Sequence, residues 1–186
     1  MDKLLQLSES RKFSLQEFLK LCCIDCMQQC DTTKVDLDTA SVDFHTSYTV
    51  FEHIPADVLV QILREGNRIV RSDGLFVHMI DYSDHFSHSD ASISAINFLQ
   101  YSDAEWSSYA GNRYMYMNRL RHDDVMALFQ QVGHRIVDMA STVDERAFDI
   151  LRKRRISLDQ RFTRKSLDVL ATRGAWIVSR NEGDRG

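Results

Sequence analysis

The sequence has few of the residues that bend or interrupt a chain. It contains one proline and seven glycines in 186 residues, and the glycines stand at positions 66, 74, 111, 133, 174, 183 and 186. A loop whose backbone closely approaches a bound nucleotide needs several glycines near one another, because glycine has no side chain to obstruct the contact. Apart from the last two, no glycines are spaced closely enough to form one. We therefore expect no glycine-rich binding loop in this chain.

Long apolar runs and paired cysteine motifs are also lacking. No run reaches the roughly 18 residues that a membrane helix needs, and the first residues show no secretory signal. The four cysteines all lie between positions 22 and 30, without a second pair to complete a zinc site. The net charge of −4 argues against bulk binding of nucleic acid, although residues 152–155 form a basic run. We expect a cytoplasmic protein with reduced thiols, without membrane or nucleic-acid partners.

Segments of helical and strand character alternate along the chain. The spacing of apolar residues predicts helices over 14–21, 55–70, 120–131, 144–154 and 162–171, and strands over 22–27, 42–47, 75–80, 136–143 and 175–179. Residues 82–118 are polar and aromatic, which predicts a loop with short helices, and residues 72–74 predict a turn. This alternation is typical of an α/β domain whose mostly parallel sheet is covered by helices.

A series of short motifs gives this pattern a family resemblance. The strand 41–47 is followed by Val50-Phe51-Glu52-His53-Ile54-Pro55, a helix ending near Val70, the turn Ser72-Asp73-Gly74 and a strand from Leu75. The series resembles strands four and five, with their linking helix, of the class I S-adenosylmethionine-dependent methyltransferases. The segment 118–134 is similar to the helix and turn before strand six of that family, and 175–179 to strand seven. The resemblance covers about residues 24–180.

The resemblance implies a Rossmann-like methyltransferase sheet that is incomplete. Strands three to seven with their flanking helices are expected, while strands one and two are absent, so that residues 1–186 form a single, N-terminally truncated domain. Because strand one normally lies beside strand four, strand four would have an unpaired edge. We expect this edge to be covered by the N-terminal helix or by a second copy of the chain in a homodimer, or else to favour aggregation.

The resemblance also assigns residues to the cofactor, S-adenosyl-L-methionine. Asp31 and Thr32 stand where the family contacts adenine, and the backbone at Ser47 and Tyr48 stands where it lines the methionine part. For Asp31, an ordinary solvated turn is an equally good interpretation, because isolated aspartates often mark turns.

Candidate catalytic residues lie in the loops after strands four and five. Glu52 with His53 forms a carboxylate–imidazole pair that could accept a proton, and His85 is a second candidate base. Glu52 could instead satisfy backbone amides at a helix start. His78 lies inside an apolar strand, so it is either a core residue or, by resemblance to the cyclopropane-synthase branch, a residue that faces the methyl-transfer site with Glu52.

The acceptor is expected to meet residues downstream of strand five. We assign Asp81, Tyr82, Tyr116 and Arg119 to it, together with His78. The aromatic side chains of this region could bind a ring or a sugar, form a small core, or make a dimer contact. Asp81, Asp84, His85 and His88 could also hold a metal in a hydrolase, but no recognised metal motif supports this, and no metal ligands are assigned.

The sequence thus predicts a methyltransferase that acts on a small molecule or a glycan precursor and that has little activity without its glycine-rich loop. The alternative is a non-catalytic interaction module on a degenerate methyltransferase scaffold. Binding of S-adenosylmethionine would distinguish the two.

Overall fold

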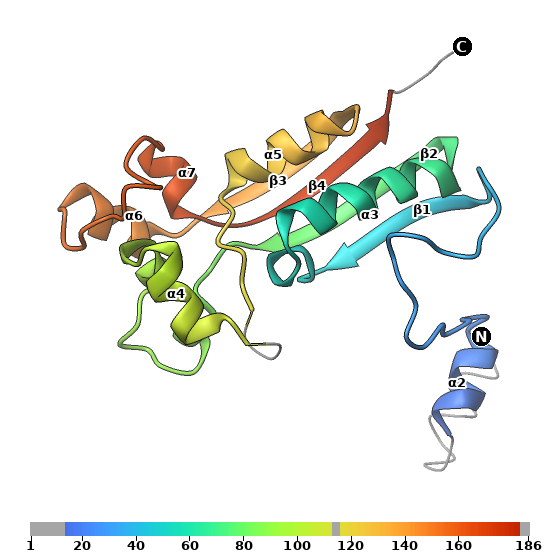
Figure 1. The fold of residues 1–186 in the computed structure, drawn as a ribbon, viewed down its shortest axis with the longest axis horizontal. Helices are drawn as coiled ribbons and strands as arrows, with labels where there is room; N and C mark the ends of the chain where they lie inside the picture. Colours follow the sequence, from blue (N-terminus) through green and yellow to red (C-terminus); the bar gives the residue numbers. More distant parts are fainter. Residues whose placement is uncertain (1–13, 113–115, 183–186) are drawn as a thin grey trace.

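The computed structural model describes residues 14–112 and 116–182 and contains a four-stranded sheet with helices (Figure 1). The strands are β1 (Val42–Tyr48), β2 (Val70–Asp81), β3 (His134–Val143) and β4 (Thr172–Asn181). The α-helices are α2 (Leu15–Leu21), α3 (Ala56–Ile69), α4 (Asp103–Ala110), α5 (His122–Gln131), α6 (Glu145–Arg152) and α7 (Leu167–Ala171). Three short 3₁₀ helices lie between them, namely η1 (Phe51–His53), η2 (His85–His88) and η3 (Asn97–Gln100).

The sheet has the strand order β1-β2-β4-β3. β1 pairs with β2 in parallel, while β4 runs antiparallel to both β2 and β3. Three of the four strands point the same way, but two of the three pairings are antiparallel, so the sheet is mixed and the expected mostly parallel sheet is only partly borne out. The two parallel strands bridged by a helix are confirmed, with His45 paired to Phe76 and Ser47 to His78.

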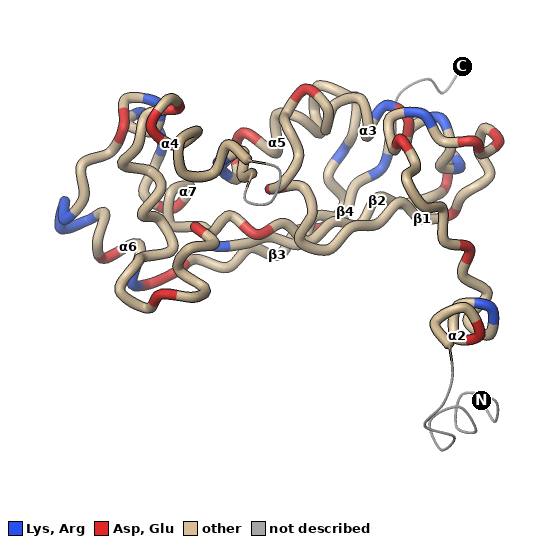
Figure 2. Tube along the Cα trace, turned by 60° about the horizontal axis from the view of Figure 1, so that its bottom comes forward, with Lys and Arg blue, Asp and Glu red and all other residues tan. Residues whose placement is uncertain are grey.

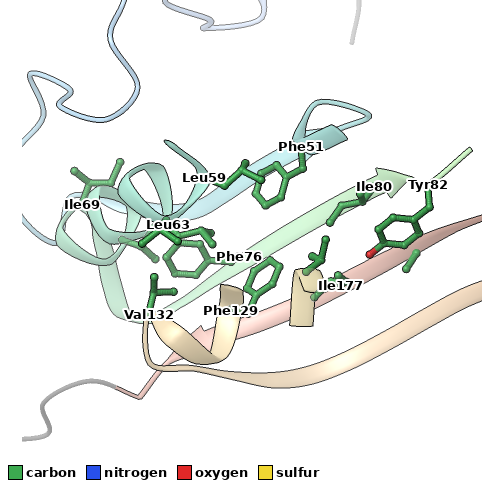
Figure 3. Packing of buried hydrophobic residues seen from close by; sticks show 14 residues of the cluster. Phe51, Leu59, Leu63, Ile69, Phe76, Ile80, Tyr82, Phe129, Val132 and Ile177 are labelled. Atoms are coloured by element: carbon green, nitrogen blue, oxygen red, sulfur yellow. The ribbon is translucent and has the colours of Figure 1, made fainter. Parts of the chain in front are cut away.

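α3 and α5 pack on the same face of the sheet and enclose the main core (Figures 1 and 2). α3 begins after Pro55 and buries a stripe at helical spacing, with Leu59 and Leu63 fully buried. Figure 3 shows this stripe against the aromatic rings of Phe76 and Phe129. Gly66 permits the close approach, because a Cβ there would lie 2.6 Å from the Phe76 ring.

A second core lies between the segment that follows β2 and the helices α6 and α7. It contains the buried Phe98, Trp106 and Phe162 together with residues of α6 and α7. The indole of Trp106 donates to the carbonyl of Met117 at 3.1 Å, so its polar atom is satisfied inside the cluster. Of the three interpretations left open for the aromatic side chains, the structure thus shows a small core.

The predicted strand over residues 22–27 is wrong. α2 begins at its Ser14–Glu17 capping box, as predicted, and ends at Leu21. Cys23 then takes a left-handed conformation with φ of 55°, while the Ile24 amide donates back to the Leu19 carbonyl at 2.8 Å. This helix-ending turn is incompatible with a strand, and the segment pairs with no described strand. Strand three of the expected sheet is therefore missing from the described residues.

Two smaller expectations also change. The turn expected at 72–74 is part of β2, where the pairing steps from Val42–Val70 to Phe44–Leu75 and so accommodates the extra residues as an irregularity in the strand. The last helix is shorter than predicted and starts at Leu167, with the Ser166 hydroxyl accepting from the Val169 amide. Gly133 ends the α5 turn with φ of 83°, as expected of a helix-terminating glycine.

The opposite face of the sheet carries exposed apolar side chains. Phe44 and Tyr48 on β1 are 58% and 65% exposed, and Trp176 on β4 is 45% exposed. The rings of Tyr48 and Trp176 lie 5.8 Å apart across β2. Within residues 14–112 and 116–182, no helix has the length and apolar character to cross a membrane.

Candidate active site

Two short 3₁₀ helices position the candidate site at the end of the sheet where the carboxyl ends of β1 and β2 lie. η1 follows β1 and η2 follows β2, and because these strands are parallel, their carboxyl ends lie side by side. Asn118 fixes η1, since its side-chain amide donates to the carbonyls of Phe51 at 2.8 Å and Ile54 at 2.7 Å. Asn118 was not among the residues singled out from the sequence, where a single asparagine in a polar loop gives no signal.

Five side chains converge at this end of the sheet and form what we call the acid–imidazole cluster: Glu52, His53, Asp81, His85 and His88. One ligand atom each of Glu52, His53 and His85 lie within 4.8 Å of one another, and so do those of Asp81, His85 and His88. The three candidate catalytic residues and the candidate acceptor residue Asp81 are thus brought together. His85 belongs to both groups and lies at the centre of the cluster.

Asp81 and His85 are electrostatically paired. The Asp81 Oδ2 lies 3.6 Å from Nε2 of His85 and 3.6 Å from Nε2 of His88, and Asp81 also accepts the Ser83 amide at 2.8 Å. Although burial opposes the charge of Asp81, its His85 and Ser83 neighbours lower the pKa to about 2. Asp81 in turn raises the pKa of His85. At neutral pH the Asp81 carboxylate is therefore charged, and it favours the protonated form of the His85 imidazole.

Glu52 has no comparable partner. It is 4% exposed, and neither of its carboxylate oxygens has a hydrogen-bond partner among the described residues. Burial, and then the charge of Asp81, raise the pKa of Glu52. The alternative that Glu52 satisfies backbone amides at a helix start is not what the structure shows, because its oxygens accept none. A buried carboxylate without donors is costly, and such groups often mark functional sites.

The backbone at Tyr116 orients His53. The Nδ1 of His53 lies 2.9 Å from the Tyr116 carbonyl, which can only accept, so Nδ1 carries a proton and Nε2 is directed away from this contact. The His53 and His85 rings lie 4.9 Å apart. Tyr116 therefore reaches the site through its backbone.

His78 and Ser47 are paired in the core, away from the cluster. His78 is fully buried, and its Nδ1 lies 2.8 Å from the Ser47 hydroxyl while its Nε2 lies 3.3 Å from Nδ1 of His45. Its ring packs 4.5 Å from that of Phe51. Of the two interpretations of His78, the structure favours a satisfied core residue.

Tyr82 and Arg119 are also engaged in packing. The Tyr82 hydroxyl lies 3.2 Å from Nδ1 of His122, and the ring is 3% exposed. The Arg119 guanidinium donates to the carbonyls of Phe98 at 2.9 Å and Tyr101 at 2.6 Å. Tyr82 is thus held against the start of α5 and Arg119 against the second core, and both side chains lie outside the acid–imidazole cluster.

The three remaining residues expected to contact the cofactor also lie outside the acid–imidazole cluster. They are Asp31, Thr32 and Tyr48. The Asp31 carboxylate accepts from the amide of Thr33 at 2.9 Å and its hydroxyl at 2.7 Å, while Thr32 lies in the same local turn. The chain just after this turn is tied to the C-terminal end of α3, where Arg68 donates to the Val35 carbonyl at 3.0 Å. Tyr48 points to the exposed face of the sheet, beside Trp176.

The strand order and the single reversed strand form an α/β fold with a mixed four-stranded sheet that resembles methyltransferase folds. Residues 3–78 match the family described as "methyltransferase domain". None of the curated proteins compared with the chain matches it. The family match covers fewer than half of the residues of the chain, so it shows a likeness to the methyltransferase domain over that segment.

Two solved structures share this fold at low sequence identity, and a third is less similar. The PH0226 protein from Pyrococcus horikoshii OT3 superposes with a TM-score of 0.54 at 11% identity, covering 90% of this chain and 65% of that protein. The BH2331 protein from Bacillus halodurans C-125 gives 0.51 at 8% identity, covering 86% and 78%. Geranyl diphosphate C-methyltransferase from Streptomyces coelicolor A3(2), in complex with Mg²⁺, geranyl diphosphate and S-adenosyl-L-homocysteine, gives 0.46 at 7% identity, covering 82% and 52%.

The residues present fit only part of such a cofactor site. The carboxyl ends of β1 and β2 supply the polar cluster on one side. Among the described residues, those that would contact the adenosine part are lacking. Asp31 is engaged in its own turn, and no glycine precedes Gly66 in the sequence to form a loop that closely approaches the cofactor. The described residues therefore supply a polar cluster on one side and no cradle for the whole cofactor.

Proposed function

We propose that the protein transfers a methyl group from S-adenosyl-L-methionine to a small molecule or a glycan precursor. The observation that carries this proposal is the convergence of Glu52, His53 and His85 at the carboxyl edge of the parallel pair β1 and β2. When bound, the cofactor supplies an electrophilic methyl group. The chain spans only 65% of the length of the Pyrococcus protein. Activity as a complete methyltransferase is therefore also a proposal.

The cluster is suited to removing a proton from the acceptor. The contact with Tyr116 holds the Nδ1 proton of His53, so the neutral imidazole has its lone pair on Nε2, and His85 lies next to Asp81. Either imidazole in its neutral form can take a hydroxyl proton, and the neighbouring carboxylates stabilise the imidazolium that results. We assign the acceptor to the space beside these residues, bounded by Asp81 and the Tyr116 backbone, and the methionine part of the cofactor to the backbone at Ser47 and Tyr48.

The test is transfer of a radiolabelled methyl group to hydroxylated small molecules and nucleotide sugars at millimolar cofactor concentration. We expect slow transfer with weak cofactor binding, because the close-approach loop is lacking. His85→Asn should lower the rate by at least about 100-fold, the usual size of a general-base contribution. Calorimetry that gives a submicromolar dissociation constant for S-adenosylhomocysteine would contradict the weak binding, and an unchanged rate in His85→Asn would contradict the site.

A non-catalytic interaction module is the second candidate, and the open edge of the sheet favours it. Among the described strands, β1 pairs with β2 alone, and its free side ends at the exposed Tyr48. Unpaired strand edges with apolar neighbours readily pair with another copy of the same strand. Under this proposal the chain forms a homodimer through β1.

The dimer proposal predicts concentration-dependent association in sedimentation velocity experiments. Tyr48→Lys places a charge at the end of the edge strand and should weaken association by at least about tenfold, because charged residues on edge strands block pairing. The same change at Tyr109, an exposed residue of α4, is the matched control and should leave association unchanged. A chain that stays monomeric at all concentrations, or equal effects of both variants, would exclude the β1 interface.

A further inference from the structure

We infer that Glu52, His53 and His85 bind one divalent transition-metal ion, with Asp81 beside His85 as the fourth donor. The four residues come from the two loops that meet at the carboxyl ends of β1 and β2. The site consists of two imidazoles and two carboxylates, and no motif in the sequence marks it.

The spacing of the donor atoms suits a single ion. Bonds from zinc to histidine nitrogen or carboxylate oxygen are about 2.0–2.2 Å, so two ligands of one ion lie roughly 3–4 Å apart. The Asp81 Oδ2 and His85 Nε2 lie 3.6 Å apart, too far for a hydrogen bond and suitable for two ligands of a shared ion. The Glu52, His53 and His85 atoms lie within 4.8 Å of one another, so small side-chain rotations would complete the site.

The side chain of Glu52 is the strongest evidence for a cation. It is 4% exposed, and both of its oxygens lack hydrogen-bond partners among the described residues. Asp81 adds a second carboxylate nearby, and a cation bound between the two carboxylates would relieve their repulsion. The buried Nε2 of His85 is likewise without a hydrogen-bond partner. A bound ion would satisfy all of these atoms at once.

The surroundings orient His53 as in known metal sites. Histidine ligands commonly donate their other ring N–H to a backbone carbonyl, which fixes the tautomer and directs the free nitrogen at the metal. His53 makes this contact with the Tyr116 carbonyl at 2.9 Å. His88 differs, because its Nε2 lies 2.9 Å from the Ser83 hydroxyl and its side chain is 44% exposed. We therefore place the ion on the Glu52 side of His85.

The donor set selects the ion. Imidazole ligands suit zinc, iron, cobalt and nickel, whereas Mg²⁺ and Ca²⁺ prefer oxygen ligands throughout. Insofar as the site also serves the proposed methyl transfer, the ion would lower the pKa of an acceptor hydroxyl that binds to it, and the hydroxyl proton would pass to water. In that state the imidazoles are ligands rather than proton acceptors. The binding of the ion itself does not depend on the proposed function.

The test is titration of the metal-free, untagged protein with Co²⁺, followed by visible absorption, and with Zn²⁺, followed by calorimetry. We expect one equivalent of either ion and no competition from Mg²⁺. Glu52→Gln, His53→Asn and His85→Asn should each weaken binding by more than about 100-fold, beyond the effect of losing an outer-shell partner. Glu52→Gln removes a buried charge at nearly constant shape, so lost binding there is not caused by unfolding.

His88→Asn is the matched control. It removes a histidine of the same cluster that we place outside the site, and it should change Co²⁺ affinity by less than about threefold, well below the tenfold effects of outer-shell changes. Absence of stoichiometric Co²⁺ and Zn²⁺ binding would overturn the inference. So would loss of binding in His88→Asn with binding retained in Glu52→Gln, because the ion would then lie on the opposite side of His85. Metal binding without any methyl transfer would refute the proposed function and leave this inference standing.

Discussion

Replacing Arg121 with methionine is expected to lower the free energy of unfolding by about 3 kcal/mol or more, among the largest effects of any single substitution in this chain. Arg121 is fully buried, and its guanidinium donates to the carbonyls of Leu170 at 2.8 Å and Thr172 at 2.6 Å, as well as to that of Tyr82. Methionine fills much of the space but leaves three buried acceptors without donors.

The position of Arg121 explains the size of this effect. It joins the end of β2 to the junction of α7 and β4, and its guanidinium lies 5.6 Å from the rings of both Tyr82 and Phe98. Burial lowers the pKa of Arg121 to about 10, so the group stays charged at neutral pH. The backbone carbonyls therefore stabilise a cation whose desolvation is otherwise unfavourable.

Urea unfolding followed by circular dichroism measures the Arg121 effect. Arg64→Met, at an exposed position of α3, makes the same chemical change and should alter stability by less than about 0.5 kcal/mol. Arg121→Lys should give an intermediate loss, because one ammonium cannot reach carbonyls on both sides as the planar guanidinium does. A loss below about 1 kcal/mol in Arg121→Met would show that the three carbonyls find other donors.

Lowering the pH from 7 to 5 is expected to remove about 4 kcal/mol of stability through two buried histidines, His78 and His134. Burial lowers the pKa of His78 to about 3 and that of His134 to about 4, both below the value of about 6.5 in the unfolded chain. The unfolded state therefore binds more protons below pH 6.5. The stability present above that pH is lost as the pH falls, by about 2 kcal/mol per residue at pH 5.

The neighbours of these two imidazoles are neutral. His134 lies 2.9 Å from the Ser179 hydroxyl and 2.6 Å from Oδ1 of Asn67, while His78 contacts Ser47 and His45. The pKa of His45 is also lowered by burial, which adds to the loss. Asp81, whose pKa is lowered, contributes mainly below this interval, whereas the raised pKa values of His85 and Glu52 act in the opposite direction and offset part of the loss.

The pH dependence can be measured by urea unfolding at half-unit steps. His78→Asn keeps a polar atom near Ser47 but does not titrate, so it should be less stable at pH 8 and lose about 2 kcal/mol less between pH 7 and 5 than the parent. A parent protein whose stability is flat over this interval would show that the core admits water and that the imidazoles ionise in place.

The arrangement of β1, α3 and β2 could be predicted from the sequence because several signals agree there. Pro55 marks the helix start, the apolar spacing of α3 selects one face, and the apolar run of β2 is too short for a helix. The prediction of a strand over residues 22–27 was wrong because an apolar segment becomes a strand only when a neighbouring strand pairs with it. Its apolar residues suit a strand, but no neighbouring strand is available, and Cys23 ends the helix instead.

The candidate site was predictable in part. Glu52, His53, Asp81 and His85 could be placed together because each follows a strand whose partner is parallel. The burial of Arg121 and the pairing of His78 with Ser47 and His45 could not, because these contacts join elements far apart in the chain. Whether a polar residue faces a core or a pocket depends on how those elements pack against one another. The periodicity of the local sequence does not predict this packing.

The strand order also has a consequence for folding during synthesis. β4 is the last of the four strands in the chain, yet it lies between β2 and β3 and pairs with both. While the ribosome extends the chain, β1 and β2 can pair, but β3 must wait without a neighbour until residues 172–181 emerge. Until then the nascent chain exposes the free edge of β2, and contact with a chaperone would protect this edge from wrong pairing.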